Sequence, residues 1–360
     1  MPWYQSEPVS GYWGWHWTMN SQNPDRLEDG RYELASHFRP LIGPYDSSDE
    51  HVLEYHLLLM KLAGVDGVII DWYGLSDFRD YPQLHRASVE LVRQVERLGM
   101  TFAICYEDQT ISALVDEDLL DETERVSHAV SEIEWLARNW FSKESYLDLD
   151  GAPVLLSFGL DGLSDSEWSS SLQKLAMPVA YFSEHHKRTA AIGAFDWPIP
   201  SEGIAYVERF QAESQQWPHS IPAAFPRFVD FYEQAGVGRS WGSIPDDNGR
   251  TFRQTLDLAL DSQAPIIQLV TWNDWGEGTA IEPSVEFGYR DLEYLQKRLK
   301  GQDAGAALIR SADLRLPYKL LQLRREGANT DRLEEASIAL ARGDLRRARE
   351  VLDREALSQK

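Results

Sequence analysis

Two acidic residues, Asp274 and Glu277, stand three positions apart in a segment that also carries Trp272 and Trp275. In a loop or a first helical turn, side chains at this spacing can point into one cleft. Two carboxylates suffice to hydrolyse a glycosidic bond, because one protonates the leaving oxygen while the other acts as base or nucleophile. Crowding and the indole rings would raise the pKa of one acid and prepare it as the proton donor. The spacing also fits two solvated loop acids, or Asp274 as a helix N-cap.

Further carboxylates and aromatic rings stand where other apolar runs of the chain end. Asp71, Glu107 and Trp197 each follow such a run. Aromatic faces can stack on the C–H surfaces of sugars, and carboxylates accept hydrogen bonds from hydroxyl groups. Glu107 could instead form a cap or a salt bridge, and Asp71 could orient a neighbouring backbone. The predicted sugar-binding residues are Glu107, Asp71, Trp72, Tyr73, Tyr4, Tyr45, Tyr106, Trp197, Asn273 and Trp275.

Signals for other chemistries are weak. The nine histidines show no metal-ligand spacing, and the adjacent pair His185-His186 suits two faces rather than one metal. No serine stands in a Gly-x-Ser-x-Gly pattern, and no glycine-rich phosphate loop follows the first predicted strand. The sequence therefore predicts a site without a catalytic metal or a cofactor.

The composition of the chain limits the classes of molecule that it is expected to bind. The chain has 360 residues, is 43% hydrophobic and carries a formal charge of −23, which disfavours binding to nucleic acid or anionic membranes. Cys105 is the single cysteine, so no intrachain disulfide can form. No apolar run reaches the ~18 residues of a membrane span. We expect a soluble cytoplasmic protein as written, or a periplasmic or secreted one if the N-terminus is trimmed, because residues 2–4 resemble the end of a strand.

Short apolar runs alternate with amphipathic stretches along most of the chain. Continuous apolarity in such runs is typical of parallel strands buried on both faces. Helices are predicted over residues 49–62, 82–98, 122–141, 164–175 and 250–261. Strands are predicted over residues 2–4, 65–71, 101–106, 153–158, 179–182, 191–195, 221–225 and 265–271, the seventh being weakened by Pro222. Eight such units favour an α/β fold of the (β/α)8 TIM-barrel type over residues 1–300.

Residues 301–360 have a different character and are predicted to form a helical appendage. Helical patterns cover residues 331–342 and 344–356, with a hinge at Gly343. The stretch 341–348 resembles the turn of a tetratricopeptide-like hairpin, but one such unit does not make a solenoid. The appendage could pack on the barrel or bind a protein partner.

Four segments together resemble the glycoside hydrolase family 71/99-like group, which includes endo-α-1,2-mannosidases and bacterial WbsX-like proteins. They are Pro2-Trp3-Tyr4 with Trp15-His16-Trp17, Gly43-Pro44-Tyr45-Asp46-Ser47, residues 63–74 ending Ile70-Asp71-Trp72-Tyr73-Gly74, and residues 272–283 beginning Trp272-Asn273-Asp274-Trp275-Gly276-Glu277. The resemblance covers about residues 2–298. It implies a (β/α)8 barrel that acts on a glycan without a metal.

The mannosidases of this group carry a Glu-Trp-x-Glu segment whose second Glu is the general acid/base, and that Glu matches Glu277. Their first Glu assists attack by the sugar's own 2-hydroxyl and falls on Asp274, where this chain departs from the pattern. The Asp carboxylate is withdrawn by ~1.5 Å, one carbon–carbon bond. A further acid after the third strand contacts substrate in that group, and Glu107 matches it by position.

The resulting hypothesis is a glycoside hydrolase that cleaves an α-linked oligo- or polysaccharide, with an endo-cleaved, mannose-containing glycan as the narrower expectation. A glycan-binding or polysaccharide-assembly protein on the same barrel remains an alternative, because of the Asp274 departure and the helical tail. A transferase is the weakest alternative, because no nucleotide-sugar site is visible in the sequence.

Overall fold

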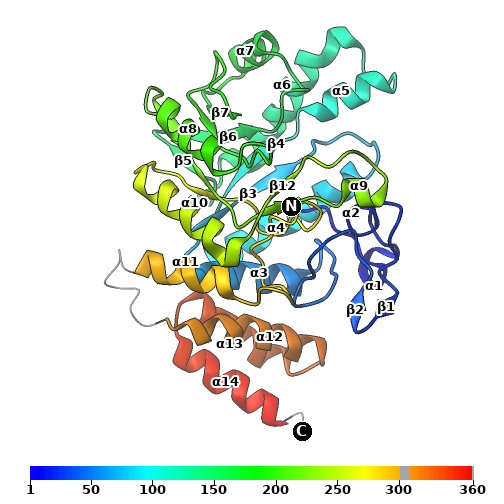
Figure 1. Cartoon of the computed structure of the whole chain (residues 1–360), viewed down its shortest axis with the longest axis vertical. Helices are drawn as coiled ribbons and strands as arrows, with labels where there is room; N and C mark the ends of the chain where they lie inside the picture. The colour runs from blue at the N-terminus through cyan, green and yellow to red at the C-terminus, as the bar shows by residue number, and fades with distance from the viewer. Residues whose placement is uncertain (301–308, 359–360) are drawn as a thin grey trace.

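A curved parallel sheet flanked by helices forms the body of the protein (Figure 1). The computed structural model describes residues 1–300 and 309–358. The strands follow one another in the order β3-β4-β6-β7-β8-β9, and β10 continues past Pro222 to pair with β13. They are β3 (Gly67–Trp72), β4 (Thr101–Tyr106), β6 (Ala152–Ser157), β7 (Ala180–Glu184), β8 (Gly193–Phe195), β9 (His219–Ile221), β10 (Ala223–Ala224) and β13 (Gln268–Leu269).

The alternation of side chains between the two faces of the sheet separates the hydrophobic core into two parts. Ala103 and Cys105 of β4 join an apolar cluster inside the barrel, whereas Ile104 and Tyr106 join the larger cluster between the sheet and the helices. Successive side chains of a strand point to opposite faces, so parity decides which strand-end residues can reach the barrel interior. Both faces are buried, as the continuous apolar runs predicted.

Helices cover the outside of the sheet. The helix α3 begins and ends at the capping residues that the sequence predicted. Asp49 caps α3 by accepting a hydrogen bond from the His51 N–H at 2.9 Å, and Gly64 ends α3 with a φ of 96°. The outer helices are α3 (Glu50–Ala63), α4 (Tyr81–Leu98), α5 (Gln109–Asp116), α6 (Arg125–Leu136), α7 (Asp165–Lys174), α8 (Ile204–Ser214), α10 (Arg250–Asp261) and α11 (Arg290–Lys300). The predicted helix 122–141 is divided into a 3-10 turn, α6 and a π-helical turn.

One predicted strand is wrong. Residues 2–4 form no strand, and in the described residues no strand pairs with the outer edges of β3 and β13. Pro2 lacks an N–H, and Tyr4 bonds to Ser47 instead: the Ser47 N–H donates to the Tyr4 carbonyl at 2.7 Å, and the Tyr4 N–H donates to Ser47 Oγ at 3.1 Å. The molecule is a (β/α)8 barrel in which the described residues form seven of the eight strand positions.

Small elements lie in the segments that connect the main strands and helices. They are α1 (Glu7–Ser10), α2 (Trp15–Thr18), β1 (Leu27–Glu28), β2 (Arg31–Tyr32), β5 (Asp148–Leu149), β11 (Phe228–Val229), α9 (Tyr232–Ala235) and β12 (Ser243–Ile244). β5 pairs with the start of β6. β11 pairs with β12, which directs the segment that carries α9 across the loop after β13. None of the helices in residues 1–300 and 309–358 is both long and apolar enough to cross a membrane.

The C-terminal helices pack on the barrel through α3 (Figure 1). They are α12 (Leu316–Arg325), which the sequence analysis did not predict as a helix, α13 (Thr330–Ala341) and α14 (Leu345–Ser358). Buried Glu54 of α3 receives hydrogen bonds from Arg324 at 2.6 Å and Ser337 at 2.6 Å, and Arg97 bonds to the same carboxylate at 2.7 Å. We call these four residues the appendage clamp. The predicted boundary after residue 300 borders residues 301–308, which lie outside the described residues.

Candidate active site

A cavity of about 840 Å³ opens at the carboxyl ends of the strands and continues along β3 and β13. Five buried or partly buried carboxylates face it, and among the described residues that line it none is a lysine or an arginine. We call these five residues the cavity acids: Asp71, Glu107, Glu184, Asp274 and Glu277. Glycosidase and other barrel active sites lie at this end of the fold.

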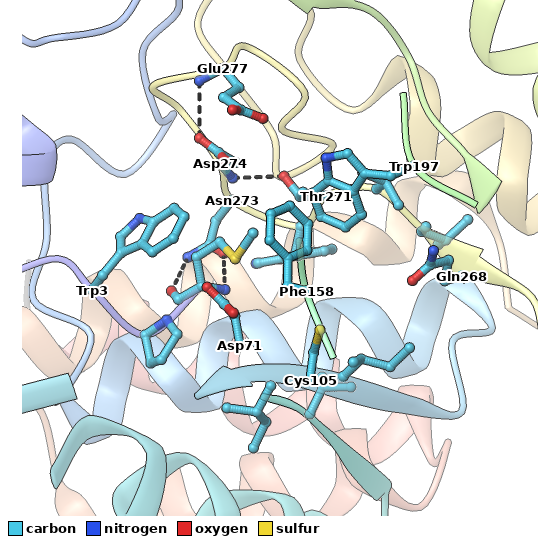
Figure 2. A pocket seen from close by; sticks show the side chains of 18 of the residues that line it. Trp3, Asp71, Cys105, Phe158, Trp197, Gln268, Thr271, Asn273, Asp274 and Glu277 are labelled. Atoms are coloured by element: carbon cyan, nitrogen blue, oxygen red, sulfur yellow. Dashed lines mark hydrogen bonds between the residues drawn. The ribbon is translucent and has the colours of Figure 1, made fainter. Parts of the chain in front are cut away.

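The loop after β13 carries the predicted catalytic pair. Figure 2 shows Asp274 and Glu277 on this loop, and Asp71 on β3. The Asp274 N–H donates to Thr271 Oγ1 at 2.7 Å, and the Glu277 N–H donates to Asp274 Oδ1 at 3.0 Å. Residues 271–279 therefore form a closed turn, hereafter the acid loop. Asp274 holds the backbone as an N-cap would while its side chain also lines the cavity.

Burial sets the protonation of this pair. It raises the pKa of Asp274 to about 6, although backbone N–H groups of Glu277 and Gly276 oppose the shift. Burial also raises the pKa of Glu277 well above its usual value, and the charge of Asp274 raises it further. Two interacting acids in one low-dielectric site lose their protons at different pH, so one can donate a proton while the other is ionised.

Tyr232 of α9 is a site residue that the sequence analysis missed. Its hydroxyl donates to Glu277 Oε1 at 3.1 Å and opposes part of the rise in the Glu277 pKa. Two backbone bonds hold α9 there, from the Val229 N–H to the Glu277 carbonyl and from the Phe231 N–H to the Gly276 carbonyl, both at 2.9 Å. No local pattern in the sequence marks this tyrosine, because it is brought to the loop by β11 from a distant segment.

Asp71 and Glu107 lie beside each other because β3 and β4 are adjacent and in register. The Glu107 N–H bonds to the Trp72 carbonyl at 2.9 Å, which aligns the two strand ends. Burial raises the pKa of Asp71 to about 7 and that of Glu107 well above its usual value, and Asp71 adds to the shift of Glu107. Gln109 donates to Glu107 at 2.5 Å, whereas both carboxylate oxygens of Asp71 lack a hydrogen-bond partner in the described structure.

Glu184, at the end of β7, is a second residue that the sequence analysis missed. It lines the cavity, accepts a hydrogen bond from the Gly159 N–H at 3.0 Å, and burial raises its pKa to about 7. The rule that selected Asp71 and Glu107, an acid at the carboxyl end of an apolar strand, would also have selected Glu184.

Aromatic side chains line the cavity around these acids. Predicted residues Tyr73 and Trp197 lie on its wall, and Trp197 meets Phe158 edge to face with ring centroids 4.8 Å apart. Trp3 stacks on His16 at 4.1 Å (Figure 2 shows Trp3). Such rings offer flat apolar surfaces beside hydrogen-bonding carboxylates, which is the combination that sugar rings require.

The structure brings eight of the twelve predicted site residues to the cavity and places four elsewhere. Those that line the cavity are Asp274, Glu277, Glu107, Asp71, Tyr73, Tyr45, Trp197 and Asn273. The buried rings of the other four pack against the protein rather than lining the cavity. Trp72 donates to His85 at 3.1 Å, Tyr106 bonds to Glu132, Tyr4 donates to the Asn273 carbonyl at 2.9 Å, and Trp275 bonds to Tyr45.

Parity explains two of these four placements. Asp71 is paired with Cys105 and Trp72 with Tyr106, so Asp71 and Cys105 face the barrel interior while Trp72 and Tyr106 face the outer helices. We do not propose sugar contacts for the four buried rings. Among residues 1–300 and 309–358, no group of three or more His, Cys, Asp and Glu side chains is arranged to hold a metal ion.

Similarity to solved structures identifies the class of fold. A family 99 endo-α-mannosidase from Bacteroides thetaiotaomicron superposes with a TM-score of 0.60 at 17% identity, covering 85% of this chain and 96% of that one. A glycoside hydrolase-like protein superposes with a TM-score of 0.55 at 14% identity, covering 72% and 88%. The predicted (β/α)8 fold is confirmed.

Sequence similarity identifies the relatives. Models of known protein families give no match to the chain. The chain is 24% identical over 323 residues to a glycoprotein endo-alpha-1,2-mannosidase-like protein of Danio rerio, covering 79% of this chain and 69% of that protein. It is 21% identical over 335 residues to the glycoprotein endo-alpha-1,2-mannosidase of Xenopus laevis, covering 81% and 70%. These similarities confirm the predicted resemblance to family 99-like glycoside hydrolases and support that enzyme class.

Proposed function

We propose that this protein hydrolyses an α-linked glycan with Glu277 as the general acid/base and Asp274 as the second carboxylate. The observation that carries the proposal is the acid loop itself, which sets buried Asp274 and partly buried Glu277, both with raised pKa values, at the carboxyl end of the barrel. A general acid needs a pKa near the working pH, and burial supplies it here. The names of the relatives support an α-mannose-containing, internally cleaved glycan as the substrate.

The remaining cavity residues fit the role of sugar contacts. Asp71 and Glu107 offer acceptors for hydroxyl groups, and Tyr73 and Trp197 offer apolar faces. Asp274 is shorter than the corresponding Glu of related mannosidases. In this chain its short side chain also accepts the Glu277 N–H, which fixes the distance between the two acids along the backbone.

Digestion of a glycan panel tests the proposal. α-Mannans and α-glucans would be incubated with the native chain and with Glu277→Gln, and products would be identified by mass without any nucleotide-sugar donor. New reducing oligosaccharides from the native chain alone are expected. Thermal stabilisation of both proteins by a glycan, without products from either, would reject hydrolysis and favour the glycan-binding alternative.

A further inference from the structure

Both neighbours of Asp274 in the acid loop are held by one phenol, that of Tyr45. Its hydroxyl accepts hydrogen bonds from Asn273 Nδ2 at 3.1 Å and from Trp275 Nε1 at 3.3 Å, and it donates to Glu282 Oε2 at 2.8 Å. A phenol hydroxyl has one donor and two acceptor positions, so these three bonds use its full capacity. Tyr45 borders the cavity but has no remaining hydrogen-bond position for a sugar.

Glu282 accepts the one hydrogen bond that Tyr45 can donate. Its side chain is fully buried, and the Tyr45 hydroxyl donates to Glu282 Oε2 at 2.8 Å. This bond uses the donor position of the phenol, which leaves both of its acceptor positions for Asn273 and Trp275. His56 of α3 lies on the other side of this carboxylate, with Nε2 3.0 Å from Glu282 Oε1.

The backbone brings Glu282 back beside the start of the acid loop. The Glu282 N–H bonds to the Trp272 carbonyl at 2.9 Å, and the Ile281 N–H bonds to the Thr271 carbonyl at 3.0 Å. The loop therefore leaves β13 and returns to it, with Tyr45 between its two arms. Fixing a reactive group within a fraction of an ångström in this way requires a rigid, hydrogen-bonded support.

We propose that Glu282, acting through Tyr45, is a positioning residue that holds Asp274 and Glu277 in their working geometry. The inference rests on the proposed function of the acid loop and adds to it a support outside the cavity acids. It also reassigns Tyr45, which the sequence analysis predicted as a sugar-binding residue, to the support of the loop.

Kinetics of Tyr45→Phe, Glu282→Gln and the double variant test the proposal, on a glycan that the native chain cleaves. Displacement of a catalytic group by about 1 Å can cost ~100-fold in rate, so we expect kcat to fall by about 10- to 100-fold with KM nearly unchanged. Because both residues act along one path, the double variant should be no worse than the worse single variant. A rise in KM at unchanged kcat, or losses that multiply in the double variant, would overturn the proposal.

Tyr146→Phe is the matched control. Tyr146 is a buried tyrosine whose hydroxyl donates to the Val154 carbonyl at 2.7 Å and accepts from the Ile104 N–H at 3.2 Å, away from the acid loop. It should change neither kcat nor KM per folded molecule. Melting temperatures of all variants separate lost folding from lost positioning.

Amide hydrogen exchange gives a readout that does not depend on activity. Exchange of residues 271–279 should accelerate by about tenfold in Tyr45→Phe and in Glu282→Gln, since each loses support for the loop, and not in Tyr146→Phe. If the native chain cleaves no glycan, the proposed function fails and the exchange measurement alone decides the positioning role. If the native chain is active while both exchange and kcat are unchanged in the two variants, the positioning role fails and the function stands.

Discussion

Two groups of buried carboxylates in this molecule have opposite surroundings. Glu54 of the appendage clamp is only 2% exposed, and burial alone would raise its pKa; bonds from Arg324, Ser337 and Arg97 instead hold the pKa below its usual value. Asp71 of the cavity acids is 5% exposed, but both its oxygens lack partners and its pKa is raised to about 7. Two carboxylates of similar burial thus favour opposite charge states: Glu54 favours the ionised form and Asp71 the protonated form.

The difference distinguishes a structural carboxylate from a chemical one. A buried carboxylate with arginine partners stays ionised and fixes the position of an element, here α12 and α13 on α3. The cavity acids have no lysine or arginine among the described residues around them, and burial raises their pKa values despite the nearby Met1 ammonium. Carboxylates with raised pKa values cluster where proton transfer is needed. The helix α3 also meets a second buried carboxylate, since Glu54 faces the appendage and His56 faces Glu282.

The largest expected effect is on activity. Glu277→Gln removes the proposed proton donor while keeping the size of the side chain, and general acid–base catalysis contributes about 100- to 10,000-fold in rate. We expect kcat to fall within that range, measured on the glycan found in the panel. Glu54→Gln serves as the comparison, with kcat per folded molecule expected to be unchanged; equal losses in both variants would remove the distinction between the two groups.

The next effect is on stability. Glu54→Gln leaves the guanidinium of Arg324, whose side chain is 7% exposed, without its buried anion. Breaking such a pair costs about 3–5 kcal/mol, measurable as a lower urea midpoint. Glu334→Gln is the control, since Glu334 pairs with the same arginine at 3.3 Å but is 44% exposed and should cost less than about 1 kcal/mol. Similar costs for the two variants would contradict the clamp.

The two groups should respond to pH in opposite directions. Asp71 has a folded-state pKa of about 7, above its unfolded value, so the folded state binds the extra proton and loses that stabilisation as pH rises from about 4 to 7. Asp71→Asn should therefore match the native chain near pH 4 and become relatively more stable toward pH 7, by up to about 1.4 kcal/mol per pH unit.

Glu54 gives the opposite sign because its folded-state pKa is lowered. Its contribution is present above its unfolded pKa and is lost as pH falls through the folded value, so the deficit of Glu54→Gln should shrink in acid. Urea denaturation at a series of pH values measures both differences. Parallel pH profiles for the two variants would show that their surroundings do not differ in the way described.

The parts of the fold and of the candidate site that depend on local sequence signals could be predicted from the sequence. The Asp49 and Gly64 end signals, the bounds of α10 and the acid loop are all encoded within a few residues. The strand-end rule found Asp71 and Glu107 but ignored alternation, so it also selected Trp72 and Tyr106, which face the helices. Because successive side chains of a strand point to opposite faces, applying this alternation at each strand end would have excluded Trp72 and Tyr106 from the predicted site.

Contacts between distant segments could not be predicted in this way. Tyr232 contacts the acid loop only because β11 carries it there, and Tyr45 contacts Asn273 of the loop across 228 residues of chain. Arg324 reaches Glu54 across 270 residues. The pattern of residues within one strand does not predict these contacts between distant segments. The appendage was correctly predicted as helical, while its contact with α3 depended on packing that no single segment specifies.

The smallest expected effect concerns Tyr232. Its hydroxyl gives Glu277, one of the cavity acids, a single neutral hydrogen-bond donor, so the surroundings of Glu277 are intermediate between those of Asp71 and those of Glu54. Its hydrogen bond favours the ionised form of Glu277 and so lowers the pKa of that acid. Removing the bond in Tyr232→Phe should raise the Glu277 pKa, and the protonated acid should persist to higher pH. The alkaline limb of kcat/KM should move upward by up to about one pH unit, with Tyr146→Phe unchanged. A downward shift would mean that Tyr232 does not donate to Glu277 in the active protein.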